Sequence, residues 1–254
     1  MGLLELQKDI IYGPVNSRRL GRSLGVNLLP THFKICSFNC CYCQYGWTSA
    51  VTNRGEEYAT AFPSLSEVTH ALRSVMHGPT EFDYITFCGN GEPTLHPVFS
   101  KIVDAALDLK SLLRPNTKLA LLSNGSMCGN LDVKAALKHI DLPILKLDAG
   151  NERAFKRMNH GHPPVTLHSI IETIKALDKY VLQTMFVRGS VDNSTDIEVD
   201  SWIEKLRELA PLWVQIYSVD RGTAHSGLKK VQPERLRQIA DLAQKTTGLK
   251  VEIF

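Results

Sequence analysis

Long apolar runs, a strong excess of one charge and scattered cysteines are all missing from this 254-residue chain. No stretch approaches the roughly 18 apolar residues of a membrane-spanning helix, so no membrane contact is expected. A formal net charge of +3 is too small to indicate nucleic-acid binding by itself. The opening residues reach Lys8 and Asp9 without an apolar signal core or a small-residue cleavage site. We therefore expect a globular protein of the cytoplasm.

The few cysteines are concentrated in one segment. Four of the six, Cys36, Cys40, Cys41 and Cys43, fall within eight positions, and the other two stand alone. A disulfide framework would distribute its cysteines along the chain to join distant segments. Cysteines crowded into one loop are more typical of metal binding.

Short apolar segments rich in β-branched and aromatic residues alternate with helical patterns. The expected strands cover residues 24–29, 84–88, 118–122, 144–147, 181–187 and 213–219. This alternation predicts an α/β fold with parallel βαβ units, either doubly wound or curled into an open barrel. Because no linker or repeat interrupts it, we expect a single domain over residues 1–254. In either fold, a ligand should bind at the carboxyl ends of the strands.

Several residues mark the ends of the expected helices. Ser64 and Glu67 form the pattern of a capping box. Pro97 is expected in the first turn of the next long helix. Near the end of the chain, Pro233 precedes an amphipathic stretch, and Gly248 is placed to end it.

Three of the clustered cysteines, Cys36, Cys40 and Cys43, are spaced C-x3-C-x2-C. Three thiolates from one short loop can each reach a different iron of a [4Fe–4S] cluster, whereas an ordinary ferredoxin cluster has four cysteine ligands. The fourth iron would then be open to an exogenous ligand.

Two other site types remain open from the residues alone. A structural zinc site needs four ligands, and His32 and Cys41 are near enough in sequence to complete a Cys40-x2-Cys43 pair. An electron-transfer iron–sulfur protein would need a fourth, well-placed cysteine. Metal analysis distinguishes a zinc site from a site with iron and sulfide.

With Tyr42 directly before the last cysteine, the motif resembles the C-x3-C-x-aromatic-C signature of the radical S-adenosylmethionine (SAM) superfamily. The resemblance implies a partial (βα)6 barrel with a core of about residues 22–220 and terminal extensions that cover it. It implies Cys36, Cys40 and Cys43 as cluster ligands, with SAM on the open iron and Tyr42 near the adenine. Reductive cleavage of SAM would give a 5′-deoxyadenosyl radical that abstracts hydrogen from a substrate.

The resemblance also assigns SAM contacts to residues that follow successive strands. Gly91, Glu92 and Pro93 match the family's Gly-Gly-Glu-Pro stretch, and Asn90 replaces its leading glycine. The implied SAM-binding residues are Tyr42, Asn90, Gly91, Glu92, Ser123, Asn124, Lys146, Asp148, Gln215 and Tyr217. For Lys146 and Asp148, a simple ion pair is the alternative, since buried charges need partners.

The segment 12–21, YGPVNSRRLG, together with residues 89–97, 146–149 and 158–159, is similar to the branch that contains wyosine-type tRNA-modifying synthetases. This likeness suggests tRNA or a nucleoside as substrate, with a peptide or a small metabolite as alternatives. Several basic residues either track a phosphate backbone or are ordinary solvated charges. They are Arg18, Arg19, Arg22, Lys156, Arg157, Lys229 and Lys230.

Two further expectations concern partners. A radical SAM enzyme needs a one-electron reductant such as flavodoxin or ferredoxin. No second group of cysteines follows Cys128, so no auxiliary iron–sulfur cluster is expected.

Arg188, at the end of the fifth expected strand, is a candidate for contact with a substrate anion.

Overall fold

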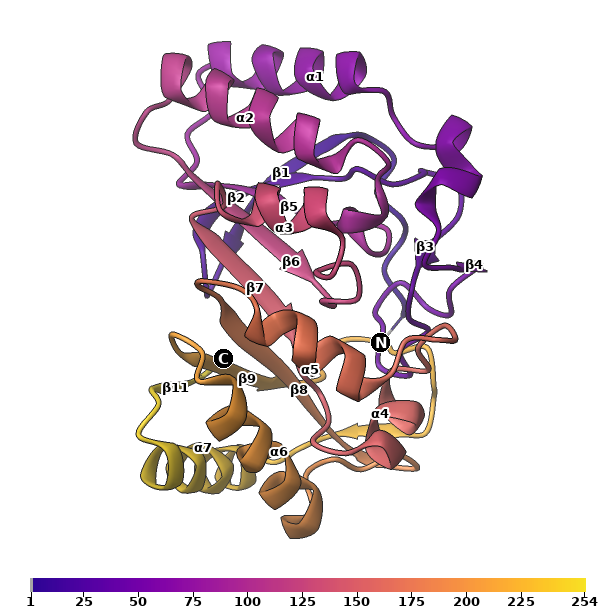
Figure 1. The fold of residues 1–254 in the computed structure, drawn as a ribbon, viewed down its shortest axis with the longest axis vertical. Helices are drawn as coiled ribbons and strands as arrows, with labels where there is room; N and C mark the ends of the chain where they lie inside the picture. The colour runs from indigo at the N-terminus through magenta and orange to yellow at the C-terminus, as the bar shows by residue number, and fades with distance from the viewer. Residues whose placement is uncertain (1) are drawn as a thin grey trace.

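Six parallel strands form the middle of the main sheet. The computed structural model of the protein describes residues 2–254. The strands are β2 (Gly21–Val26), β5 (Tyr84–Phe87), β6 (Lys118–Ser123), β7 (Leu142–Lys146), β8 (Val181–Gly189) and β9 (Val214–Ser218), each paired with the next. The expected α/β fold with a parallel sheet is confirmed. The sheet fans from β1 to β11 without closing into a full barrel (Figure 1).

Five shorter or more exposed strands lie outside this parallel set. β1 (Ile11–Ser17) pairs antiparallel with β2, and β11 (Val251–Ile253) pairs parallel with β9. β10 (Leu228–Lys230) pairs antiparallel with β8. β3 (Ile35–Cys36) and β4 (Ala50–Val51) form a separate small sheet. β1, β10 and β11 mix apolar with polar residues, and β3 and β4 are only two residues long, so hydrophobic patterning does not reveal them.

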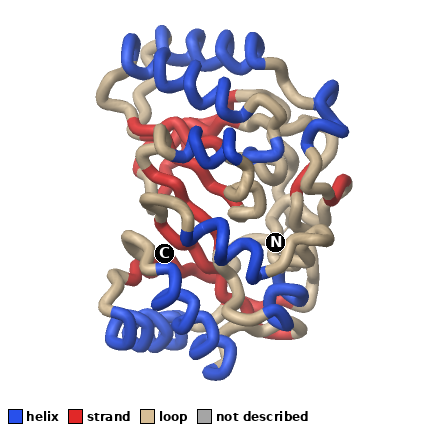
Figure 2. Tube along the Cα trace, in the orientation of Figure 1, coloured by secondary structure: helices blue, strands red, loops and turns tan. Residues whose placement is uncertain are grey.

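The helices lie on the outer side of the curved sheet (Figures 1 and 2). They are α1 (Leu65–His77), α2 (Phe99–Leu113), α3 (Leu131–Leu137), α4 (Glu152–Met158), α5 (Leu167–Lys175), α6 (Asp196–Leu209) and α7 (Pro233–Thr247), with 3-10 helices η1 (Gly55–Ala61) and η2 (Pro93–Leu95). Their apolar faces pack on the sheet in one large core. Within residues 2–254, none of these helices has the length and apolar character needed to cross a membrane.

Most of the expected helix ends are confirmed. Ser64 caps α1 in a capping box with Glu67, Pro233 opens α7, and Gly248 ends it with φ +75°. The placement of Pro97 in a first turn is wrong, because α2 begins at Phe99. The His96 ring accepts the Val98 N–H and the His96 carbonyl accepts the Phe99 N–H, a turn that keeps residues 97–98 outside the helix.

Inward-facing side chains fill the amino-terminal part of the curved sheet. Leu20, in the turn between β1 and β2, packs against Ala120, Ile144 and Val181 on the concave side. The turn therefore closes the concave side at the amino-terminal ends of the strands. The remaining space on that side opens toward their carboxyl ends.

Candidate functional site

A cavity of about 710 Å³ lies on the concave side of the sheet, between the β1–β2 hairpin and the cysteine loop. Ten of the thirteen residues assigned from the sequence to the cluster or to SAM line it. They are Cys36, Cys40, Tyr42, Cys43, Gly91, Glu92, Ser123, Asn124, Lys146 and Tyr217. Residues from four strand ends and one loop therefore converge, as the topology of parallel strands requires.

Backbone hydrogen bonds fix the cysteine loop to two distant segments. The Cys41 N–H donates at 2.9 Å to the carbonyl of Met158, the last residue of α4. The His225 N–H donates to the Cys41 carbonyl at 2.8 Å, and the Ala224 N–H donates to that of Cys43 at 3.1 Å. The path of the loop is thus set by tertiary contacts on both sides.

Each of the three sulfurs faces one side-chain N–H donor. The pairs are Lys34 Nζ with Cys43 Sγ at 3.0 Å, Asn159 Nδ2 with Cys40 Sγ at 3.4 Å and Asn124 Nδ2 with Cys36 Sγ at 3.6 Å. Donors of this kind stabilise negative charge on ligating sulfur. Burial raises the pKa of Cys36 and raises that of Cys40 to about 11, so metal binding must displace thiol protons. Three sulfurs on one cavity wall, each with a donor, fit a [4Fe–4S] cluster.

Cys41 lies apart from these three sulfurs. Its side chain is fully buried among Met158, Met185 and Val187, and it does not line the cavity. All six cysteines are free thiols. Among residues 2–254, no three His, Cys, Asp or Glu side chains are arranged around a point that would hold one metal ion.

Gly91 allows the loop after β5 to lie directly against the cysteine-bearing strand β3. Its φ is +146°, and a Cβ there would stand 1.7 Å from the Ile35 carbonyl oxygen. The Glu92 N–H donates to that same oxygen at 3.2 Å. Only glycine fits so close a backbone approach.

Asn90 lies outside the cavity, although the sequence assigns it to SAM. Its side chain is buried, and its Nδ2 donates to the carbonyls of Gln7 and Pro30, both at 2.9 Å. Its Oδ1 accepts the Gln7 N–H at 2.8 Å. The residue that replaces the family's leading glycine therefore fixes the N-terminal segment.

Glu92 is a buried carboxylate on the cavity wall. It accepts hydrogen bonds from the backbone and hydroxyl of Thr94, from Ser123 Oγ at 2.8 Å and from the Asn124 N–H at 2.7 Å. Burial raises the pKa of Glu92, and these hydrogen bonds act in the opposite direction. The site is thus a fixed acceptor suited to a ligand ammonium group.

Lys146 and Asp148 form the ion pair that the sequence left as an alternative. Lys146 Nζ lies 2.9 Å from Asp148 Oδ1 and donates to the Tyr217 hydroxyl at 3.1 Å. The Tyr42 hydroxyl donates to Asp148 Oδ2. Asp148 itself is fully buried behind the cavity wall. Burial, followed by this carboxylate, raises the pKa of Tyr42 well above its usual value.

Gln215 is the third assigned residue that does not reach the cavity. Its Oε1 accepts from Gln183 Nε2 at 3.0 Å, and Gln183 in turn accepts from the Tyr217 hydroxyl at 3.1 Å. Gln215 therefore contacts Tyr217 only through Gln183, which it helps to orient.

The sequence analysis missed the contribution of β1 to the cavity. Tyr12 and Cys88 both line it, and the Tyr12 hydroxyl lies 2.8 Å from Cys88 Sγ. A Cβ at Gly25 would stand 2.2 Å from the Tyr12 ring, so glycine in β2 makes room for that ring. A glycine within an apolar strand is the signal that could have indicated this close approach.

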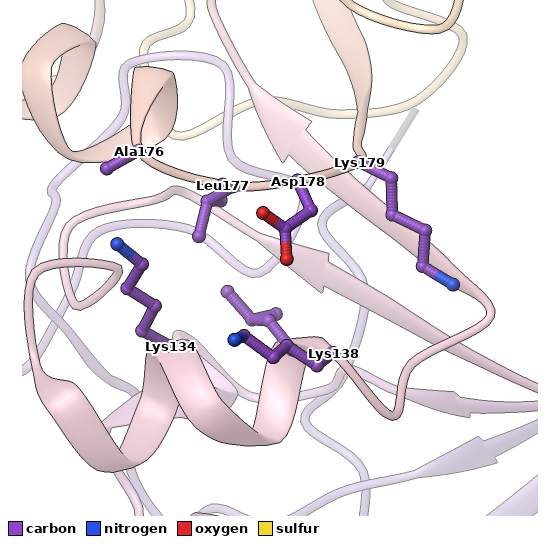
Figure 3. Close-up of a pocket in the computed structure, with 7 residues that line it drawn as sticks. Lys134, Lys138, Ala176, Leu177, Asp178 and Lys179 are labelled. Carbon is purple, nitrogen blue, oxygen red and sulfur yellow. The ribbon is translucent and has the colours of Figure 1, made fainter.

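A smaller hollow of about 220 Å³ lies between α3 and residues 176–179, which precede β8 (Figure 3). Lys134 of α3 and Lys138, the residue directly after α3, face that segment across the hollow. Because the C-terminal ends of helices lead into the amino ends of the next strands, this hollow is at the opposite end of the sheet from the cysteine loop. None of the assigned residues lies there.

Comparison with known proteins agrees with the cysteine motif and the fold. The family model of the radical SAM superfamily matches residues 31–200. The chain belongs to the radical SAM superfamily. Radical SAM proteins are enzymes that use a [4Fe–4S] cluster and SAM, which gives this chain the same two cofactors.

Curated relatives of this radical SAM chain match most of its length. A UPF0026 protein of Methanocaldococcus jannaschii is 32% identical over 244 residues, covering 94% of this chain and 72% of that protein. A UPF0026 protein of Helicobacter pylori strain J99 is 30% identical over 233 residues, covering 90% and 72%. A Brachyspira hyodysenteriae protein named GTPase Obg is 26% identical over 253 residues, and this chain spans only 35% of its length.

Solved structures of radical SAM proteins share the fold. A radical SAM methyltransferase from Sphaerobacter thermophilus has a TM-score of 0.65 at 13% identity, covering 91% of this chain and 65% of that one. Streptococcus suis SuiB bound to S-adenosylmethionine has a TM-score of 0.61 at 14% identity, covering 91% and 49%. TYW1 with a lysine-pyruvate adduct has a TM-score of 0.57 at 16% identity, covering 91% and 76%.

Proposed function

We propose that this chain reductively cleaves SAM in the 710 Å³ cavity and uses the product radical on a substrate bound in the same cavity. When bound, the reduced cluster supplies the electron that splits SAM into methionine and a 5′-deoxyadenosyl radical, which abstracts hydrogen from the substrate. The observation that carries the proposal is that Cys36, Cys40 and Cys43 line the same cavity as Glu92.

The chain's own residues would hold and orient the two cofactors. Cys36, Cys40 and Cys43 would ligate three irons and leave the fourth to SAM. The fixed Glu92 carboxylate suits the SAM ammonium group. Tyr42, held by Asp148, would lie beside the adenine.

The test is anaerobic reconstitution with iron and sulfide, followed by reduction with dithionite in the presence of SAM. We expect 5′-deoxyadenosine and a cluster EPR spectrum that changes when SAM is added. Zinc without iron or sulfide, or a cluster spectrum indifferent to SAM, would contradict the proposal. A flavodoxin or ferredoxin should replace dithionite as the reductant.

RNA modification is our first proposal for the substrate, because of the motif likeness in residues 12–21. The surface cations give it limited support. Arg18 and Lys230 both pair with Asp220, and Arg22 pairs with Glu81 and Asp83. Binding of tRNA at low salt that weakens as salt rises would support this substrate. No binding at low salt would exclude it.

A further inference from the structure

Two adjacent arginines in the β1–β2 turn have opposite surroundings. Arg18 is exposed, and its Nη2 lies 3.2 Å from Asp220 Oδ2. Arg19 turns inward and lines the cavity. The two side chains carry the same charge, so their difference is one of environment alone.

The Arg19 guanidinium is held by aromatic rings rather than by acceptors. Its Cζ lies 4.3 Å from the centre of the Tyr217 ring and 5.6 Å from that of Phe254. Its Nε is buried without a hydrogen-bond partner, and no carboxylate among residues 2–254 is within ion-pair distance of Arg19. Stacking fixes the plane of the group. It leaves the buried Nε–H donor unsatisfied, which is costly.

The other charged groups on the cavity wall already have partners. Lys146 pairs with Asp148, and Glu92 accepts hydrogen bonds from its own chain. Arg221 Nη1 donates to Gln44 Oε1 at 3.4 Å. In the part of the chain that the structure describes, Arg19 is therefore the cavity cation that lacks an acceptor.

Arg19 lies next to Tyr217, one of the residues assigned to SAM, rather than next to the cysteine loop. It contacts Tyr217, whose hydroxyl accepts from Lys146, and Lys146 lies over the Tyr42 ring at 5.3 Å. Lys146 and Tyr217 thus stand between Arg19 and the cysteine loop. A ligand that fills the space near Arg19 would lie beside bound SAM, where a substrate must be.

We propose that Arg19 binds a carboxylate or phosphate oxyanion of the substrate. The proposal deepens the proposed function and rests on it. A guanidinium fork held flat by Tyr217 can donate two parallel hydrogen bonds to such a group. In a desolvated cavity these charge-assisted bonds are stronger than at the surface.

The test uses the cluster-loaded protein saturated with SAM, with sodium phosphate and sodium acetate as separate probes at constant ionic strength. Calorimetry and thermal unfolding would measure binding to the unaltered chain, to Arg19→Met and Arg19→Lys, and to the matched control Arg18→Met. We expect millimolar binding of at least one probe to the unaltered chain and to Arg18→Met. Binding should weaken at least tenfold in Arg19→Met and in Arg19→Lys, because lysine has no planar fork. The probe that binds identifies the kind of oxyanion.

Three results would overturn the proposal. The first is equal anion binding by Arg19→Met and the unaltered chain, and the second is binding of neither probe to the unaltered chain. The third comes from the same titration repeated without SAM: anion binding that is present there and lost at saturating SAM, since Arg19 would then serve the SAM carboxylate. Formation of 5′-deoxyadenosine by the unaltered chain is measured separately. Arg19-dependent binding without SAM cleavage would support the oxyanion site while refuting the proposed function.

Discussion

Lys146 Nζ lies 2.9 Å from Asp148 Oδ1, and this pair joins the end of β7 to the cysteine loop. Asp148 accepts from the Tyr42 hydroxyl and from Asn159 Nδ2, and Asn159 also donates to Cys40 Sγ. One buried carboxylate therefore orients a lysine on the cavity wall, an aromatic ring and a donor to a candidate cluster ligand.

Replacing Lys146 with methionine should destabilise the protein by about 3 kcal/mol, because it leaves a buried carboxylate without its cation. Burial disfavours the charged lysine, but Asp148 and Tyr217 outweigh it and raise the pKa of Lys146. The stabilisation should be complete below the ordinary lysine pKa of about 10.4 and fade as pH rises through the raised value. Urea unfolding at pH 8 and at pH 11 measures both effects.

The control for this prediction is the exposed pair Lys205–Glu208, with a nitrogen–oxygen distance of 2.8 Å. Lys205→Met should cost less than about 1 kcal/mol, since solvent screens exposed pairs. Equal losses for the two methionine variants would show that the buried pair has no special role.

Alanine at Cys36, Cys40 or Cys43 should prevent cluster loading and SAM cleavage. Alanine at Cys41, Cys88 or Cys128 should retain the cluster. Cys41→Ala is the sharpest control, because its position adjoins Cys40 while its side chain lies outside the cavity. Iron and sulfide analysis with EPR measures loading. Loss of the cluster in Cys41→Ala with retention in Cys40→Ala would mean that the ligand set is wrong.

Removing a donor to a cluster sulfur should make the reduction potential more negative. A hydrogen-bond donor to sulfur stabilises the reduced, more negatively charged cluster. Asn124→Ala and Asn159→Ala each remove one such donor. Asn130→Ala is the control. It removes the cap of α3, and should cost about 1 kcal/mol of stability without changing the potential. Potentiometric titration followed by EPR measures the potential, and unchanged potentials in both Asn124→Ala and Asn159→Ala would disprove the role of these donors.

Gly91→Ala should destabilise the protein by about 3 kcal/mol or more and impair cluster loading, because its Cβ would overlap the Ile35 carbonyl. Gly78→Ala is a matched control, since its Cβ would meet its nearest atom at an ordinary 3.4 Å and its φ is −74°. Thermal unfolding and iron content compare the two. A Gly91→Ala protein as stable and as well loaded as Gly78→Ala would refute the close-approach argument.

Local patterns predicted the parts of the molecule that depend on neighbouring residues. The spacing of Cys36, Cys40 and Cys43 is set within one loop, and the capping box of α1 is set within four residues. The parallel strands and the polar residues at their ends follow from the regular βαβ alternation, which left open whether the sheet is doubly wound or curled. The family resemblance assigned Asn90 and Gln215 to SAM, but a sequence position does not reveal that their side chains are engaged by other residues outside the cavity.

The cysteine loop, the six parallel strands and the family chemistry could all be predicted from the amino-acid sequence. Which side chains face the cavity could be seen only in the folded molecule. The antiparallel hairpin of β1 and β2 brings Tyr12 to Cys88 and Arg19 to Tyr217, which lie far apart along the chain. The physical reason is that these contacts depend on the curvature of the whole sheet, which packing of its outer helices sets, and no short segment encodes that curvature.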